Sequence, residues 1–131
     1  MGEPVLTFTI YGEPRSKKNS MRIVKMGNRY SLVQNERYRT YERDAVSQIT
    51  EAHKAHHIEY HCNIKYTFYR STHRRVDLSN LIAAADDILV KAGVIEDDNW
   101  KIVGGHDGSR VRFDPVAPRT EILITPLGIN E

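Results

Sequence analysis

The sequence contains almost no cysteine and no long hydrophobic segment. Its single cysteine, Cys62, excludes an internal disulfide and suits a reducing compartment. No run of about 18 apolar residues occurs, which argues against a membrane span, and no basic segment precedes the short apolar stretch at the N-terminus, as a signal peptide requires. Positive and negative charges nearly balance, with 19 Lys and Arg against 17 Asp and Glu, so net charge indicates no partner. We therefore expect a cytoplasmic protein without a membrane segment.

The length and composition predict a single folded domain over residues 1–131. A chain of 131 residues is close to the ~150 residues typical of one domain. Hydrophobic residues make up 40% of the chain, which argues against extensive disorder. No linker and no internal repeat interrupts the sequence.

The order of apolar patterns predicts an α+β domain. Alternating residues predict strands at 5–11, 60–70 and 120–125, and hairpins that pair 21–25 with 29–32 and 100–103 with 110–113. Apolar residues at helical spacing predict one long helix from 36 to about 57, with Asn35 as its cap, and a second over 78–92, ended by Gly93. Two main helices on a mostly antiparallel, mixed sheet are expected.

Charges are unevenly distributed along the chain. Cations crowd the first thirty residues, at Arg15, Lys17, Lys18, Arg22, Lys25 and Arg29, whereas acidic residues concentrate between positions 77 and 98. A basic surface beside an acidic pocket suits a substrate that carries phosphates and needs a metal ion. Ordinary solvated charge is the alternative interpretation.

Aspartates lie on both sides of the second predicted helix. Asp77 immediately precedes it, where the side chain can cap the first turn, and Asp87 lies within it. If the chain doubles back after the helix, Asp97 or Asp98 can approach Asp77. Carboxylates brought together in this way repel one another unless they are protonated or share a cation, and hard oxygen ligands favour Mg²⁺ or Mn²⁺. The alternative to a metal site is that these aspartates only cap the helix and form turns.

The same stretch resembles a known family. The run from Arg74 to Leu81, then Asp87, then the run from Ala92 to Asn99, is similar to the RusA family of Holliday junction resolvases. In that family a basic patch precedes Asp-Leu-Asp-Asn-Leu, a helix with an internal aspartate follows, and a glycine turn leads to an Asp-Asp pair. The loop from Pro14 to Asn19 is similar to the family's loop after the first strand. Both motifs at this spacing are fairly specific, whereas either alone would be weak.

The resemblance implies a homodimer that binds four-way DNA junctions and nicks two strands symmetrically with Mg²⁺, for which Mn²⁺ can substitute. Such proteins are often encoded by phages and prophages. Transferred by position, the catalytic and metal-binding residues are Asp77, Asp87, Asp97 and Asp98. The DNA-binding residues expected to grip phosphates are Lys17, Lys18, Arg74 and Arg75.

Two departures from the family pattern leave alternatives open. Ser79 occupies the position of the second aspartate, and Ala83 occupies that of a catalytic lysine, which Lys91 or Lys101 could replace. The chain could therefore be a junction-binding protein that cuts slowly or not at all. A third interpretation is a small structural or interaction module, in which the acidic residues only cap the helix and interact with solvent.

A cluster of histidines precedes the strand at 60–70. Its members are His53, His56, His57, His61 and Cys62. A structural zinc site typically uses two or more cysteines, whereas histidine near the end of a helix is favoured by the helix dipole. We therefore favour the helix-end role over a zinc site.

Overall fold

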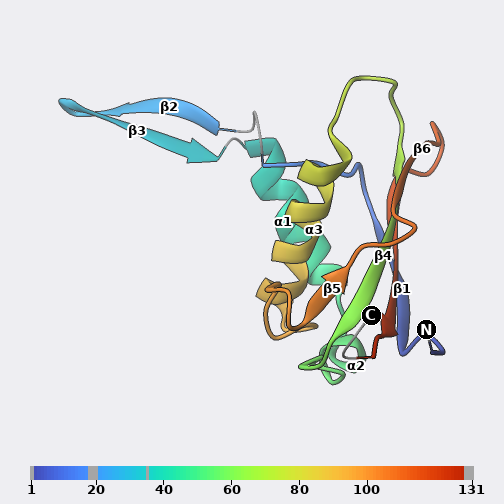
Figure 1. Ribbon diagram of the computed structural model, residues 1–131. Coiled ribbons are helices and arrows are strands. Elements are labelled where there is room, and N and C mark those ends of the chain that lie inside the picture. Colours follow the sequence, from blue (N-terminus) through green and yellow to red (C-terminus); the bar gives the residue numbers. More distant parts are fainter. Residues whose placement is uncertain (1, 18–20, 35, 129–131) are drawn as a thin grey trace.

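A computed structural model of the protein describes residues 2–17, 21–34 and 36–128. Its main sheet contains five strands, which are β1 (Leu6–Tyr11), β4 (Cys62–Arg70), β5 (Val103–Gly105), β6 (Arg110–Phe113) and β7 (Arg119–Pro126). β7 lies between β1 and β4 and is antiparallel to both, whereas β5 and β6 pair with β4 in parallel (Figure 1). This arrangement confirms the predicted α+β domain with a mixed, mostly antiparallel sheet.

The predicted hairpin between residues 100 and 113 is wrong. β5 and β6 pair with the two ends of β4 in succession, so that Cys62 lies opposite Val103 and Arg70 opposite Phe113. Between them the buried side chain of Asn63 accepts a hydrogen bond from the Asp107 amide at 2.8 Å and donates one to its carbonyl at 3.2 Å. The hydrogen bonds of this side chain replace backbone pairing where the chain between β5 and β6 bulges away from β4. The residues between β5 and β6 therefore form a loop between two segments of one interrupted edge strand.

The long helix predicted from residue 36 to about 57 is also interrupted. α1 (Glu36–Gln48) and α2 (Glu51–Lys54) are separate because Thr50 starts a new helix. The Thr50 hydroxyl accepts from the His53 amide, and the His53 ring accepts in turn from the Thr50 amide, which is a reciprocal capping arrangement. Asn35, the expected cap of the first helix, lies outside the described residues.

The second predicted helix is confirmed as α3 (Leu78–Ala92). Gly93 ends it with a left-handed φ of 83°, a conformation that glycine adopts without the steric cost of a side chain. Its amide donates to the carbonyls of Leu89 and Val90. The strong local signals at the end of this helix explain why the sequence predicts its C-terminal boundary correctly.

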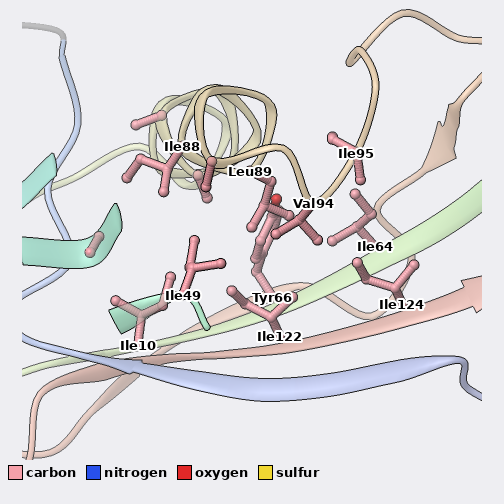
Figure 2. Packing of buried hydrophobic residues seen from close by; sticks show 14 of the residues in the cluster. Ile10, Ile49, Ile64, Tyr66, Ile88, Leu89, Val94, Ile95, Ile122 and Ile124 are labelled. Carbon is pink, nitrogen blue, oxygen red and sulfur yellow. The ribbon is translucent and has the colours of Figure 1, made fainter. Parts of the chain in front are cut away.

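The hydrophobic core lies between the main sheet and the two long helices, α1 and α3, which cover one face of it (Figures 1 and 2). Ile88 and Leu89 of α3 face Ile64 of β4 and Ile122 of β7. Tyr66 and Phe68 on β4 are also buried in the core. Cys62 is buried with them, and burial raises the pKa of its thiol to about 11.

A second sheet consists only of β2 (Met21–Met26) and β3 (Arg29–Gln34), which pair as the predicted hairpin. The hairpin extends away from the body of the molecule (Figure 1). Its tip exposes Met26 and Tyr30 together with the cations Lys25 and Arg29. Within the part of the chain that the structure describes, no helix is long and apolar enough to cross a membrane.

Candidate acidic site and nucleic-acid interface

Asp77 is the residue that immediately precedes α3. It has an extended backbone, and its carbonyl accepts the first hydrogen bonds of the helix from the amides of Asn80 and Leu81. Its side chain makes no capping bond to the helix backbone, contrary to the capping role considered for it. One carboxylate oxygen instead accepts from the Asn80 side chain at 3.2 Å, and the residue is exposed. The carboxylate therefore lies at the positive end of the helix dipole, where negative charge is stabilised.

Asp87 forms an ion pair with Lys17, a residue of the loop that follows β1. The Lys17 ammonium lies 2.8 Å from a carboxylate oxygen of Asp87, and both side chains are about two-fifths exposed. The same ammonium lies 5.9 Å from the centre of the Tyr38 ring, on α1. The predicted phosphate-gripping lysine thus reaches the acidic face of α3. Lys18, its predicted companion, lies outside the described residues.

The two lysines considered as substitutes for the family lysine occupy other surroundings. Lys91 donates to Glu42 of α1 at 2.6 Å, so its charge is already paired across the two helices. Lys101 is exposed in the loop that follows α3. Ala83 lies one helical turn before Asp87 and is exposed on the same face of the helix. Lys17 therefore reaches the residue one helical turn beyond Ala83, on the same face of the helix.

Asp97 and Asp98 belong to the turn between α3 and β5. Asp97 accepts hydrogen bonds from the Asp98 amide at 2.7 Å and from the Asn99 side chain at 3.0 Å, and these bonds lower the pKa of its carboxyl group. The pKa of Asp98 is raised, first by partial burial, then by its hydrogen bond with Asp97, and then by the charges of Asp86 and Asp87. Asp98 therefore lies within electrostatic reach of the middle of α3.

The four predicted site aspartates do not form one cluster within a single chain. Asp77 and Asp87 are separated by ten residues of α3, about 15 Å along its axis at ~1.5 Å per residue. The segment before α3 and the turn that carries Asp97 and Asp98 join opposite ends of this helix (Figure 1). In residues 2–17, 21–34 and 36–128 of one copy, no three Asp, Glu, His or Cys side chains are close enough together to hold a metal ion.

The histidines before β4 are dispersed as well. His53 stacks on Phe8 of β1, and His57 bonds to the carbonyl of Gly93 at 3.0 Å. His61 contacts the carbonyl of Lys101, and Cys62 points into the core. Each of these contacts has a structural role.

Sequence reasoning missed Asp86, the neighbour of Asp87 within α3, which is only 5% exposed. It accepts a hydrogen bond of 2.6 Å from the hydroxyl of the fully buried Tyr66, and Nε2 of His106 lies 2.8 Å from its other oxygen. Burial, followed by the charge of Asp86 and this hydrogen bond, holds the pKa of Tyr66 well above its usual range. The signal in the sequence is an acidic residue at a position of the predicted helix that is flanked by core residues. A carboxylate that is buried there requires hydrogen-bonding or charged partners.

Arg74 and Arg75 lie on the loop between β4 and α3 and are exposed. Neither forms an ion pair with a carboxylate in the described part of the chain. Two adjoining surface hollows share Arg70, Thr72 and Arg74; one extends to Arg75 and Arg112, and the other to Arg15 and Arg37. We call this combined surface the arginine groove. Among the described residues that line it, Glu13 is the only acidic one.

Contacts with Glu13 and Arg70 hold the loop beside the groove in place. The carboxylate of Glu13 accepts from the Ser71 amide at 3.1 Å and lies 3.8 Å from Nε of Arg70. The Arg70 guanidinium donates to the carbonyl of Arg74 at 2.9 Å. Glu13 therefore helps to orient the loop, and within the described residues the outer arginines form no ion pair with a carboxylate, which leaves their charge available to phosphate oxygens.

Comparison with known proteins agrees with these features. A family model described as endodeoxyribonuclease RusA matches residues 11–125. The crossover junction endodeoxyribonuclease RusA of Aquifex aeolicus (strain VF5) is 28% identical over 87 residues, which cover 60% of this chain and 69% of that protein. The family match includes the arginine groove, the whole of α3 and the turn that follows it. The chain therefore belongs to the RusA family of endodeoxyribonucleases.

Proposed function

We propose that this endodeoxyribonuclease resolves four-way DNA junctions by paired nicks that depend on a divalent cation. The observation that carries the proposal is the arginine groove directly preceding Asp77, within a chain of the RusA family. Unpaired guanidinium groups bind phosphates without regard to sequence, as recognition by DNA shape requires. The carboxylate beside them lies where a bound backbone would pass.

The aspartates suit a hard divalent cation such as Mg²⁺ or Mn²⁺. Such ions are usually held by one or two carboxylates together with substrate phosphates and water. The pKa of Asp98 is raised first by partial burial and then by its hydrogen bond with Asp97 and the charges of Asp86 and Asp87, so several carboxylates lie near it. When bound, the metal ion would neutralise phosphodiester charge and activate water for hydrolysis. Asp77, Asp97 and Asp98 are the proposed ligands, and Asp87 contributes negative charge near Asp98 while it orients Lys17.

In a homodimer, the aspartates that lie apart within one chain can come together. Since α3 separates Asp77 from the turn of Asp98 within each copy, we propose that Asp77 of one copy meets Asp98 of the other. A two-fold axis relates two such sites, because each copy contributes one half to each of them. Two symmetric sites match two strands of a junction, which would explain paired nicking. The gene is proposed to be of phage or prophage origin, as members of this family often are.

Lys17 is the proposed replacement for the lysine that Ala83 lacks. Its ammonium reaches the face of α3 that also carries Ala83, and Asp87 fixes its position at 2.8 Å. A positive charge there would stabilise the phosphate during the reaction or give a proton to the leaving oxygen. Lys91 is the weaker candidate because its partner is Glu42 of α1 and not one of the predicted site aspartates.

The proposal is tested by incubating the protein with a synthetic four-way junction and Mg²⁺. We expect two nicks at symmetric positions, and no cleavage when the divalent ion is removed with a chelator. A linear duplex of the same sequence serves as the control and should remain intact. Cleavage of the duplex at the same rate would contradict specificity for junctions.

Replacing Arg75 with alanine is expected to weaken junction binding and to lower its salt dependence. Each phosphate contact contributes about 0.9 to the slope of log K against log salt, so losing one contact should reduce the slope by about 1. The measurement is a titration of a labelled junction at several salt concentrations. Arg43→Ala, which removes an exposed cation of α1 outside the groove, is the matched control. An equal change in both variants would contradict a specific role for Arg75.

A second candidate function is junction binding without efficient cleavage. It is favoured by Ser79 and Ala83, which are exposed near Asp77 and Asp87 but carry neither a carboxylate nor an ammonium group. If this candidate is correct, the double variant Ser79→Asp with Ala83→Lys should gain cleavage while the affinity for the junction changes little. Junction nicking by the unmodified protein at the rate of the double variant would exclude this candidate.

A further inference from the structure

An aromatic pair stands at the edge of the arginine groove. The ring of His73, on the loop before α3, stacks on the ring of Phe113, the last residue of β6, with centres 3.9 Å apart and planes 18° from parallel. Phe113 is 46% exposed in spite of this contact, and His73 is exposed too. The pair therefore keeps aromatic surface open to solvent.

The surroundings of the pair are strongly cationic. The hollow that both rings line has a volume of about 340 Å³, and its charged lining residues are Arg70, Arg74, Arg75 and Arg112. None of the described residues that line it is acidic. Open aromatic surface next to guanidinium groups is the combination that proteins use to bind nucleic acid with unpaired bases, since the base stacks on the ring while the backbone meets the cations.

We propose that this hollow binds an unpaired nucleotide of branched DNA, with its base stacked on the His73–Phe113 pair and its phosphate held by the adjoining arginines. The proposal rests on the proposed function, because branched DNA is the substrate assumed. Bases inside a continuous duplex are already stacked on both faces. At a branch point the stacking is interrupted, so a base there can leave the helix at lower cost.

The position of the hollow connects this contact to the acidic site. His73 precedes Asp77 by four residues, a stretch of chain that spans at most about 14 Å. The intervening loop is fixed by Glu13 and Arg70, as described above. A nucleotide held on the aromatic pair would therefore place a neighbouring phosphate within reach of Asp77. Recognition of the branch point and alignment of the scissile bond would then depend on the same loop.

The competing explanation is that the two rings only pack the loop against β6. Phe113→Leu separates the two explanations, because leucine keeps apolar contact with His73 but offers no aromatic face. The experiment measures the affinity of the wild type and this variant for two synthetic four-way junctions, with Ca²⁺ in place of Mg²⁺ to prevent cleavage. One junction is complete, and the other lacks the bases at its branch-point nucleotides.

We expect Phe113→Leu to bind the complete junction about tenfold more weakly than the wild type, in line with the value of one stacked base. On the junction without branch-point bases the two proteins should bind equally. Val116→Ala, which alters an exposed apolar residue outside the hollow, should match the wild type on both.

An equal loss of affinity on both junctions would overturn the stacking proposal and leave only a packing role for Phe113. Unchanged affinity on both would overturn it as well. If the wild type does not distinguish a four-way junction from linear duplex, the proposed function fails instead, which is a separate outcome. Circular dichroism and a melting curve for Phe113→Leu exclude misfolding as the cause of weaker binding.

Discussion

Asp98→Asn is expected to abolish junction cleavage while leaving junction binding intact. Asparagine has nearly the same shape but no negative charge, so it holds a divalent cation poorly. Removing a group that only supports a metal ligand typically costs 10–100-fold in activity or affinity, so losing a ligand itself should cost at least about 100-fold. The rate of nicking of a labelled four-way junction measures this effect, and a binding titration with Ca²⁺ checks the affinity.

The same result is expected for Asp77→Asn, although this residue lies at the other end of α3. Glu3→Gln removes an exposed carboxylate far along the chain from the site and should cleave normally. If cleavage survives both aspartate substitutions, the assignment of the site is wrong. If binding is lost together with cleavage, these carboxylates have a structural role instead.

Asp86→Ala is expected to cause the largest loss of stability among the polar substitutions. It leaves the buried Tyr66 hydroxyl without its acceptor at 2.6 Å and removes the partner of His106. Breaking a buried interaction that involves a charged group costs about 3–5 kcal/mol, which corresponds to a fall in melting temperature of roughly 10–20 °C for a domain of this size. Thermal unfolding followed by circular dichroism provides the measurement.

The double variant Asp86→Ala with Tyr66→Phe tests the cause of this loss. Removing the hydroxyl also removes the unsatisfied donor, so the double variant should be about as stable as Asp86→Ala alone or more so. Purely additive losses from the two substitutions would contradict the hydrogen bond as the source. Asp87→Ala, on the exposed side of the same helix, should change stability by less than about 1 kcal/mol.

Features determined by local interactions could be predicted from the sequence. The helix at 78–92 and its end at Gly93 depend on periodicity and on one backbone conformation, and both predictions are confirmed. Features determined by distant partners could not be predicted. The hairpin expected at 100–113 is replaced by parallel pairing with β4, a strand about forty residues earlier, and the buried side chain of Asn63 bridges the gap.

The candidate site shows the same contrast. Arg74 and Arg75, the predicted basic residues before Asp77, lie on an exposed loop, because the stretch contains no apolar periodicity. The partnership of Asp86 with Tyr66, twenty residues away, and the ion pair of Lys17 with Asp87 both depend on how the loop after β1 and the strand β4 pack against α3. Neither contact leaves a pattern in the sequence that identifies the partner.

The most direct test of the shared site is cleavage by mixed dimers. Asp77→Asn and Asp98→Asn chains, each inactive alone, are co-expressed with different tags, and the heterodimer is purified. If Asp77 of one copy works with Asp98 of the other, one of the two sites in this dimer is unaltered, and we predict that it nicks one strand of a four-way junction. A heterodimer that nicks neither strand, although it binds the junction, would contradict an active site built from two copies.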